Sequence, residues 1–480
     1  MTYQKMIVAL DIGTSGCRAA AVRGDGSVAL QQEEPLVPLR SAPGLSEYQA
    51  EELLRAARQT LHAVLDGIGP QQIACLAVTS QRSTIVLWDK TTGKPIGPVL
   101  TWEDGRAQAQ AEQASISQEE VHAQTGLYKT PFFSAPKIAW ILQHVPQASQ
   151  SLKQGNLLAA PVASYIIWHL TNGQVFATDV SLAQRTLLLD VKSAAWSPSL
   201  CQAFGVPMEI LPKLLPSAAD YGTYTYQGVK IPISVCVGDQ QAAAAYFNLQ
   251  ATDSLINYGT GAFWLYHTGE KAVFLPGMLT SLAATAGTAS NAYLLEGPVN
   301  SAGSALLWLK AQGISFDEEE LQTICVSSKR PVWFLPALGG LGAPYWDFKI
   351  SAAAEGLCPL TQKEDWVAGA VRGVAFLLAD IGAYLRANGC ATSGKIQVSG
   401  GLSRLNYLTA FQADILQQDL WVLPQADATL LGAALLAARQ KGVALNFVKD
   451  FRRIAPTLSA PQARELYTYW QQFLMRQRQK

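Results

Sequence analysis

The sequence has little charge, and the charge it has is balanced. Only 15% of its 480 residues are charged, and 36 basic residues match 36 acidic ones, so the formal net charge is zero. A nucleic-acid-binding protein or a membrane-surface protein normally carries a basic excess. The balance therefore argues against both kinds of partner and favours small molecules or other proteins.

Cysteine is also scarce. The seven cysteines are odd in number, widely scattered, and form no Cys-x-x-Cys pair. This pattern is typical of reduced thiols in a cytoplasmic protein rather than of a disulfide framework. The five histidines do not cluster with the cysteines at ligand spacing, which leaves a structural zinc site without support.

Long apolar runs are missing as well. The longest candidate, residues 157–170, is too short to cross a bilayer and contains Pro161 and His169. Residues 1–13 run directly into a strand-like segment and show no cleavable signal. These features predict a soluble protein of the cytoplasm.

The chain does have enough apolar material for a large interior. It is 49% hydrophobic, and its length exceeds what one hydrophobic core usually supports. Strand and helix signals alternate from residue 6 onward, which favours an α/β fold with a mainly parallel core and added hairpins. The second half repeats this plan, so we expect domains at residues 1–245 and 246–480.

Several segments show the element signals clearly. Apolar runs predict strands at 6–10 and 73–80, and Leu and Ala at helical spacing predict a helix over 47–68. The corresponding signals in the second half are a strand-turn-strand at 254–269, a long helix at 364–389, a strand-turn-helix at 395–416 and a helix at 429–442.

A lone acid precedes a glycine-rich turn near the start of the chain. Asp11 ends an apolar run, and the turn after it consists of Gly13, Thr14, Ser15 and Gly16. Such a turn exposes backbone N–H groups to phosphate oxygens, and Arg18 adds positive charge. A carboxylate like that of Asp11 can hold magnesium, directly or through water. The turn predicts a metal–phosphate site, although the motif alone fits a plain hairpin equally well.

Two further glycine turns follow strand-like segments. Gly259, Thr260 and Gly261 form one, and Gly400 and Gly401 lie in the other. A glycine pair between a strand and a helix exposes amides at the positive end of the helix, where anions bind. Each turn alone is more often structural, but three of them at strand ends favour a nucleotide site.

Asp239 lies where an apolar strand meets an Ala-rich helix. A helix N-terminus stabilises a carboxylate, and an ionised carboxylate can accept the proton of a hydroxyl that attacks a phosphorus atom. The motif therefore allows Asp239 to be a catalytic base, but taken alone it favours a simple N-cap, worth about 1 kcal/mol.

These motifs, in this order and over nearly the whole chain, resemble those of the FGGY family of carbohydrate kinases. Within that family, residues 81–96 and 341–347 are most similar to glycerol kinase. The segments that carry the resemblance are LDIGTSGCR, TSQRSTIVLWDKTTGKPI, TWEDGRA, FFSAPKIAWILQH, VGDQQAA, NYGTGAF, LGGLGAPYWD and VSGGLSRLNYLTAFQADIL.

The resemblance implies a duplicated actin-like ATPase fold of the ribonuclease H-like kind, with two domains and a cleft between them. It implies transfer of the γ-phosphate of ATP to a hydroxyl of a small polyol or sugar, with Asp239 as general base. Asp11 is then the ligand of Mg²⁺, and Gly303 and Gly401 line the adenine and ribose. The phosphates are expected to lie at Gly13, Thr14, Ser15, Arg18, Gly259, Thr260 and Gly261. Relatives of this kind often form dimers or tetramers, so a homo-oligomer is compatible with the resemblance.

The expected acceptor site departs from the glycerol kinase pattern at two positions. Ser83 replaces a glutamate, and Phe132 replaces a tyrosine. Each lost hydrogen-bonding partner typically costs about 1–3 kcal/mol, so the two together weaken glycerol by roughly a hundredfold if nothing compensates. We therefore expect a polyol or sugar acceptor without assuming glycerol. The residues that match the glycerol-site pattern are Arg82, Trp102, Asp239, Gln240 and Phe263.

Three alternatives to a polyol or sugar kinase of this kind stay open at this point. The protein could be a glycerol kinase proper, an ATPase switch of the same fold, or a protein that binds sugar or nucleotide without catalysis. The segments around Asp239 and residues 132–144 resemble substrate-domain segments of sugar kinases, which argues against the switch. Dependence of ATP turnover on an added alcohol distinguishes a kinase from the other two.

Overall fold

The contacts within the chain divide it into two units, each built around a mixed sheet. The computed structural model describes residues 5–286, 291–391, 393–423 and 427–479. Unit 1 comprises Met1–Asn248, Thr280–Tyr293 and Asp427–Val448, and unit 2 comprises Leu249–Leu279, Leu294–Ala426 and Lys449–Lys480. A domain boundary near residue 245 stays a prediction, and the structure adds that two later segments pack with unit 1.

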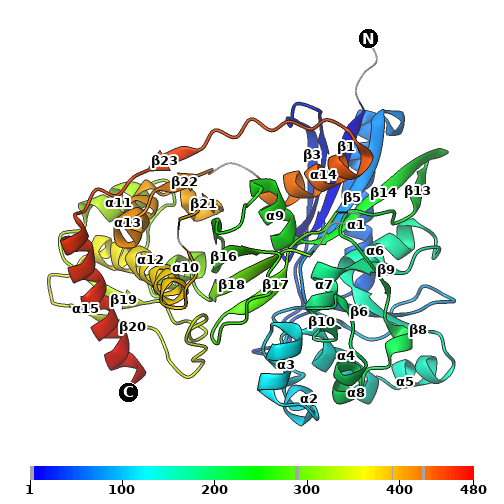
Figure 1. Ribbon diagram of the computed structural model, residues 1–480, viewed down its shortest axis with the longest axis horizontal. Coiled ribbons are helices and arrows are strands. Elements are labelled where there is room, and N and C mark those ends of the chain that lie inside the picture. The colour runs from blue at the N-terminus through cyan, green and yellow to red at the C-terminus, as the bar shows by residue number, and fades with distance from the viewer. Residues whose placement is uncertain (1–4, 287–290, 392, 424–426, 480) are drawn as a thin grey trace. The chain divides into compact units, whose positions relative to one another are not determined.

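Unit 1 contains a six-stranded sheet in the order β13-β14-β5-β1-β2-β3 (Figure 1). Its strands are β1 (Met6–Ile12), β2 (Gly16–Val22), β3 (Val28–Pro35), β5 (Ile73–Ser80), β13 (Thr223–Tyr226) and β14 (Val229–Gly238). Only β14, β5 and β1 are parallel to one another. The outer strands are antiparallel to their neighbours because short turns join them, and short turns allow no other pairing. The sheet therefore has a parallel centre with antiparallel hairpin strands added to it, as expected.

Helices pack against this sheet, among them α1 (Ala50–Ile68), α9 (Asp239–Phe247) and α14 (Ala428–Lys441). The last of them comes from near the end of the chain, yet it contacts β1, β5 and α9, and Figure 1 shows the orange α14 beside the blue strands. The helices expected over 47–68 and 429–442 are confirmed.

A smaller sheet in unit 1 has the order β4-β7-β6-β8. Its strands are β4 (Glu47–Tyr48), β6 (Ile85–Asp89), β7 (Val99–Leu100) and β8 (Leu157–Pro161). Two short pairs accompany it, β9 (Ala177–Asp179) with β12 (Lys213–Leu215) and β10 (Leu189–Asp190) with β11 (Ala195–Trp196). The helices of this region are α2 (Gln108–Gln113), α3 (Gln118–Thr125), α4 (Ser134–His144), α5 (Pro146–Lys153), α6 (Val162–Leu170), α7 (Val180–Gln184) and α8 (Pro198–Phe204).

Unit 2 holds most of a seven-stranded sheet in the order β17-β18-β16-β15-β21-β22-β23. The strands are β15 (Ser254–Tyr258), β16 (Ala262–Gly269), β17 (Leu279–Leu282), β18 (Tyr293–Val299), β21 (Ile396–Ser399), β22 (Leu420–Val422) and β23 (Arg452–Ile454); β19 (Trp333–Leu335) and β20 (Ala353–Glu355) form a separate pair. The helices are α10 (Gly303–Ala311), α11 (Leu321–Ser327), α12 (Lys363–Ala387), α13 (Asn406–Leu416) and α15 (Ala460–Arg478).

The two sheets repeat one topology. In unit 1 the antiparallel hairpin β1–β2 is followed on the β1 side by the parallel strands β5 and β14. In unit 2 the antiparallel hairpin β15–β16 is followed on the β15 side by the parallel strands β21 and β22. The repeat expected from the sequence is therefore confirmed as a repeat of strand order and direction.

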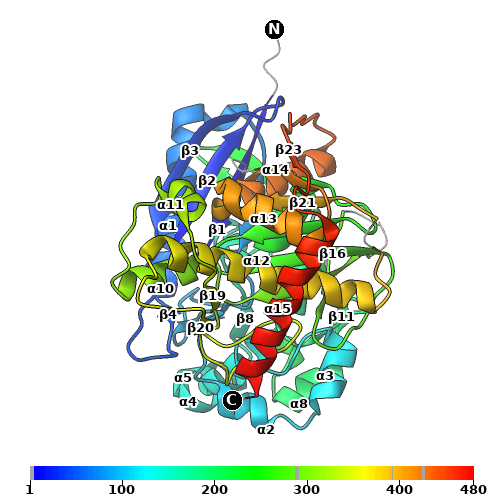
Figure 2. The ribbon, with the colours of Figure 1, turned by 90° about the vertical axis from the view of Figure 1, so that its left-hand side faces the viewer.

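Helix α12 is the long core helix of unit 2. It is long and apolar enough to cross a membrane, with a mean hydropathy of 1.5 over its most apolar window, but 83% of that window is buried inside the protein. Helix α15 crosses it (Figure 2), and Trp470 stacks on Phe376 with ring centroids 4.9 Å apart. Burial raises the pKa of Asp380 to about 7, although side chains of α15 donate hydrogen bonds to its carboxylate, which lower that pKa. These contacts identify α12 as a core helix that anchors the C-terminal helix.

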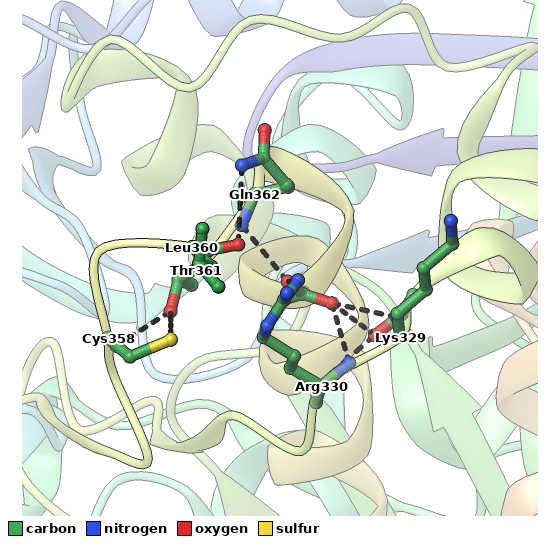
Figure 3. Close-up of polar contacts among 8 residues, drawn as sticks. Lys329, Arg330, Cys358, Leu360, Thr361 and Gln362 are labelled. Carbon is green, nitrogen blue, oxygen red and sulfur yellow. Dashed lines mark hydrogen bonds and ion pairs between the residues drawn. The ribbon is translucent and has the colours of Figure 1, made fainter.

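The start of α12 is fixed by the carboxylate of Asp365, which is 1% exposed. Its oxygens accept hydrogen bonds from the backbone N–H groups of Lys329 and Arg330, both at 2.9 Å, and of Gln362 at 3.0 Å. Figure 3 shows these three residues gathered at the helix start. Burial raises the pKa of Asp365, but the hydrogen bonds outweigh it, so the pKa lies below its usual value.

We expect Asp365→Asn to lower the free energy of unfolding by about 1–3 kcal/mol, because an amide nitrogen then faces buried donors. A lowered pKa stabilises the fold above the unfolded-state value, and this contribution is lost as the pH falls through the folded value. Urea unfolding should therefore show a constant difference from wild type near neutrality that shrinks below about pH 4. The exposed Asp25 offers the matched control Asp25→Asn, and an equal loss there would contradict the account.

Candidate active site

The carboxyl ends of three parallel strands lie at one edge of the unit 1 sheet. Ile12 of β1 and Gly238 of β14 are both in register with Ser80 of β5. The residues that follow these strands, including Gly13 and Asp239, therefore leave the sheet side by side. Open α/β sheets bind their ligands at this edge. The structure thus brings the first glycine turn and the predicted base to the same place.

Asp11 lies in an ion-pair network at this edge. It is 2% exposed, and its Oδ2 lies 2.5 Å from Nη2 of Arg18, the residue opposite it on β2. Nη1 of Arg18 lies 2.6 Å from Oδ2 of Asp427, the N-cap of α14. Burial lowers the pKa of Arg18, but the carboxylates of Asp11 and Asp427 outweigh it and raise that pKa. Arg18 is therefore a fixed cation between two acids.

The second carboxylate oxygen of Asp11 is available to the Mg²⁺ ion that the sequence predicts. Within the described residues, its Oδ1 is buried and has no hydrogen-bond partner. No group of three or more His, Cys, Asp and Glu side chains in that part of the chain is placed to hold a metal ion. Magnesium usually takes one or two carboxylates and fills its remaining positions with water and substrate phosphates. One free carboxylate oxygen beside a phosphate-type turn fits that pattern.

A closed series of hydrogen bonds joins the first glycine turn to Trp102. The indole Nε1 of Trp102 donates to Thr14 Oγ1 at 3.0 Å, and its backbone N–H donates to Thr84 Oγ1 at 3.0 Å. Thr84 in turn donates to Gln81 Oε1 at 2.9 Å, and Gln81 Nε2 donates to the carbonyl of Gly13 at 3.2 Å. The predicted phosphate turn and one predicted acceptor residue are thus held as a unit.

Asp239 is the first residue of α9, with Gly238 in the N-cap position. Its Oδ1 accepts a hydrogen bond from the backbone N–H of Gln240 at 2.7 Å and lies 3.4 Å from Nε of Arg82. The side chain of Asp239 is 29% exposed, so a ligand can reach it. Within the described residues, Oε1 of Gln240 is buried without a hydrogen-bond partner. Two consecutive residues at the start of α9 therefore supply a partly exposed carboxylate and an unsatisfied acceptor oxygen.

The two residues that depart from the glycerol kinase pattern differ in exposure. Ser83 is 9% exposed and has a φ of 65°, whereas Phe132 is 41% exposed, as is Trp102. Both Ser83 and Phe132 have their carbonyls within reach of one buried lysine, Lys137. Phe263 belongs to unit 2, on β16 opposite Asn257. Its predicted contact with the acceptor stays a prediction.

The predicted nucleotide turns of unit 2 lie together at the end of β15. The carbonyl of Thr260 accepts hydrogen bonds from the backbone of Ala302 and Ser304 at the start of α10, at 2.9 and 3.0 Å, and Gly303 donates to Gly259 at 3.0 Å. Gly400 has a φ of 94°, and a Cβ there would lie 2.2 Å from the carbonyl of Tyr258, so only glycine fits. The structure thus groups three turns that the sequence separates.

Four residues of this edge escaped the sequence analysis. Asp427 stands two residues before the helix expected at 429–442, but nothing local indicated a partner 409 positions away. Gln81 and Thr84 flank the predicted acceptor residues Arg82 and Ser83, and Lys137 lies in the segment FFSAPKIAWILQH, which carries part of the family resemblance. Their contacts depend on how distant segments meet, which no local spacing shows.

Two family models match the chain. The N-terminal domain of the FGGY family of carbohydrate kinases matches residues 6–245, and the C-terminal domain of that family matches residues 254–440. The glycerol kinase of Limosilactobacillus reuteri (strain DSM 20016) is 34% identical over an alignment of 496 positions, which covers 98% of this chain and 98% of that protein. The glycerol kinase of Mycoplasma pneumoniae is 35% identical over 470 residues, which cover 94% and 91%.

Solved structures agree with the family models. The crystal structure of Plasmodium falciparum glycerol kinase with ADP has a TM-score of 0.91 and 25% identity, and the match covers 99% of this chain and 98% of that one. A xylulose kinase from Rhodospirillum rubrum has a TM-score of 0.84 at 21% identity, with 98% of each chain covered, and shows the fold alone. These matches confirm the expected duplicated α/β fold of actin-like ATPases. They also confirm the expected activity class, ATP-dependent phosphorylation of a sugar or polyol. The chain belongs to the FGGY family of carbohydrate kinases.

Proposed function

We propose that Asp239 is the general base that activates the acceptor hydroxyl of a small polyol or sugar. The observation that carries the proposal is the position of Asp239 at the carboxyl end of β14 and the N-terminus of α9. The positive end of a helix favours the ionised carboxylate, and the neighbouring guanidinium of Arg82 adds to this effect. An ionised Asp239 can take a proton at Oδ1 or Oδ2.

The reaction then follows the general scheme of phosphoryl transfer. The acceptor oxygen gives its proton to Asp239 and forms a bond to the γ-phosphorus, while the bond from that phosphorus to the β–γ bridging oxygen breaks and ADP leaves. Arg82 and Gln240 orient the acceptor, because one is a donor and the other has an unsatisfied acceptor oxygen. Trp102 and Phe132 offer exposed aromatic surface to its C–H groups.

We assign the phosphates of ATP to the residues of the glycine turns at 13–16 and 259–261, and its nucleoside to the turns around Gly303, Gly400 and Gly401. The main-chain N–H groups of these turns and the cation of Arg18 suit anionic oxygens. Asp11 is the proposed ligand of Mg²⁺, through its free Oδ1. When bound, the metal ion neutralises charge on the phosphates. The cytoplasm is the proposed location, since the seven cysteines are free thiols.

A coupled ADP-release assay with Mg-ATP tests the proposal over a panel of polyols, ketoses and aldoses. We expect turnover that depends on one acceptor or a few related ones. Turnover that proceeds equally without any acceptor would contradict the proposal and favour an ATPase switch. No turnover with any compound, despite measurable ATP binding, would favour a binding protein.

The acceptor preference is open to a direct test. We expect the double variant Ser83→Glu with Phe132→Tyr to raise kcat/KM for glycerol by about tenfold or more, because it supplies two hydrogen-bonding groups that the wild type lacks. The measurement is kcat/KM for glycerol and for the best acceptor of the panel, in wild type and variant. A glycerol value that stays flat or falls would mean that other residues set the preference.

A further inference from the structure

We infer that Lys137 positions the acceptor-binding wall formed by Ser83 and Phe132, and that it thereby sets the affinity for the acceptor. The inference rests on the proposed function, because it concerns acceptor binding at that same site. Lys137 acts through the main-chain carbonyls of both residues, so it is a positioning residue.

The contacts of Lys137 are unusual for a lysine. Its side chain is completely buried on α4. Its Nζ donates to the carbonyl of Phe132 at 2.6 Å and makes a longer contact, 3.5 Å, to the carbonyl of Ser83. A buried amine is costly unless it is hydrogen-bonded, so these carbonyls are held firmly where Nζ can reach them.

The two carbonyls come from segments far apart in the sequence. Phe132 lies just before α4, whereas Ser83 lies in the loop between β5 and β6. Ser134, the first residue of α4, also donates from its Oγ to the carbonyl of Ser83 at 3.2 Å. Ser134 and Lys137 of α4 therefore both contact the carbonyl of Ser83, and Lys137 also links that carbonyl to the carbonyl of Phe132.

The backbone of Ser83 needs this support. Its φ of 65° is in the left-handed region, which costs a residue other than glycine roughly 1–2 kcal/mol. Such a conformation persists only where surrounding contacts fix it. Arg82 precedes Ser83 directly, and its Nε lies 3.4 Å from Asp239 Oδ1. A rotation of the Ser83 main chain would therefore move the guanidinium that faces the predicted base.

The role does not require a charged amine. Burial lowers the pKa of Lys137 to about 7, and the carboxylate of Asp104 opposes that shift. Both the ammonium and the neutral amine donate hydrogen bonds. If Lys137 served only the stability of α4, its replacement would leave the ratio of KM for the acceptor to KM for ATP at the wild-type value. A change in that ratio therefore distinguishes a positioning role from a purely structural one.

Steady-state kinetics of three variants test the inference, with the best acceptor of the panel and with ATP. Lys137→Met keeps the length of the side chain and removes its donor. Ser134→Ala removes one donor to Ser83 only. The control is Thr60→Val, which removes a buried hydroxyl that donates to Ala56 within α1 at 3.0 Å. Thermal unfolding reports the stability of each variant.

We expect Lys137→Met to raise KM for the acceptor by about tenfold and Ser134→Ala by about threefold, with KM for ATP unchanged within about twofold, because only the acceptor wall loses hydrogen bonds. Thr60→Val should change neither constant. If Lys137→Met does not fold, Ser134→Ala decides the question alone.

Two results would overturn the inference in different ways. An active wild type whose variants keep the acceptor KM, or raise both Michaelis constants together, would overturn this inference and leave the proposed function standing. A wild type without acceptor-dependent turnover would overturn the proposed function, and the role of Lys137 in acceptor binding would fall with it.

Discussion

Asp239→Asn should lower phosphoryl transfer by about a thousandfold, because the amide cannot take the proton of the attacking hydroxyl. The side chain keeps its size and its place at the first position of α9. Binding of ATP is expected to stay within about twofold of wild type, since the substitution removes no phosphate-binding group. The measurements are kcat by coupled ADP release and the Kd for ATP by titration calorimetry.

A matched control separates the loss of a base from the loss of any aspartate. Asp66 lies on α1, is exposed, and accepts a hydrogen bond from the hydroxyl of Tyr226 at 2.9 Å. Asp66→Asn makes the same chemical change and should leave kcat near the wild-type value. An Asp239→Asn enzyme with the kcat of Asp66→Asn would show that the base lies elsewhere.

Gly432→Ala should lower the free energy of unfolding by about 3 kcal/mol, because the added methyl group has no room. A Cβ at Gly432 of α14 would lie 1.8 Å from the carbonyl oxygen of Ala242 in α9. That oxygen belongs to the main chain, so no side-chain rotation relieves the contact. Chemical denaturation of the purified variant measures the loss.

A glycine-to-alanine substitution in another helix, Gly67→Ala in α1, is the control. Gly67 lies in α1, and a Cβ there would meet only the end of the Leu30 side chain, at 2.5 Å. That side chain can move, and alanine is the better helix former by about 0.5–1 kcal/mol. Gly67→Ala should therefore be neutral or slightly stabilising. Equal stability of the two variants would contradict the close approach of α14 to α9.

The clash at Gly432 also reaches the site. Helix α9 begins with Asp239, so displacement of α9 moves the predicted base relative to β5 and Arg82. We therefore expect that whatever Gly432→Ala protein folds has a lower kcat as well. A Gly432→Ala protein with reduced stability but the kcat of wild type would show that α14 supports only the fold and not the position of Asp239.

Much of the fold was predictable because its signals are local. The strands around Asp11 and Asn257 are short apolar runs that are almost fully buried, and α1 repeats Leu and Ala at helical spacing. The residues of the candidate site were found for a related reason. Glycines and single acids at strand ends stand out against apolar surroundings, and their order along the chain resembled one family.

The remaining features depend on contacts between distant segments. The pairing of Arg18 with Asp427 requires α14 to pack beside β1, and nothing near residue 427 indicates that partner. The left-handed backbone of Ser83 and the contact of Lys137 Nζ with its carbonyl likewise arise where the loop between β5 and β6 meets the start of α4. Which particular strands are parallel depends on such contacts as well, because an apolar strand pattern does not reveal direction.

The central claim is that the γ-phosphate of ATP ends on a hydroxyl of a sugar or polyol. Phosphorus-31 NMR of the wild-type protein with Mg-ATP and the best acceptor of the panel tests it most directly. The account predicts that the γ-phosphate signal is replaced by that of a phosphate monoester of the acceptor, together with ADP. Inorganic phosphate as the sole new product, formed at the same rate without acceptor, would contradict it.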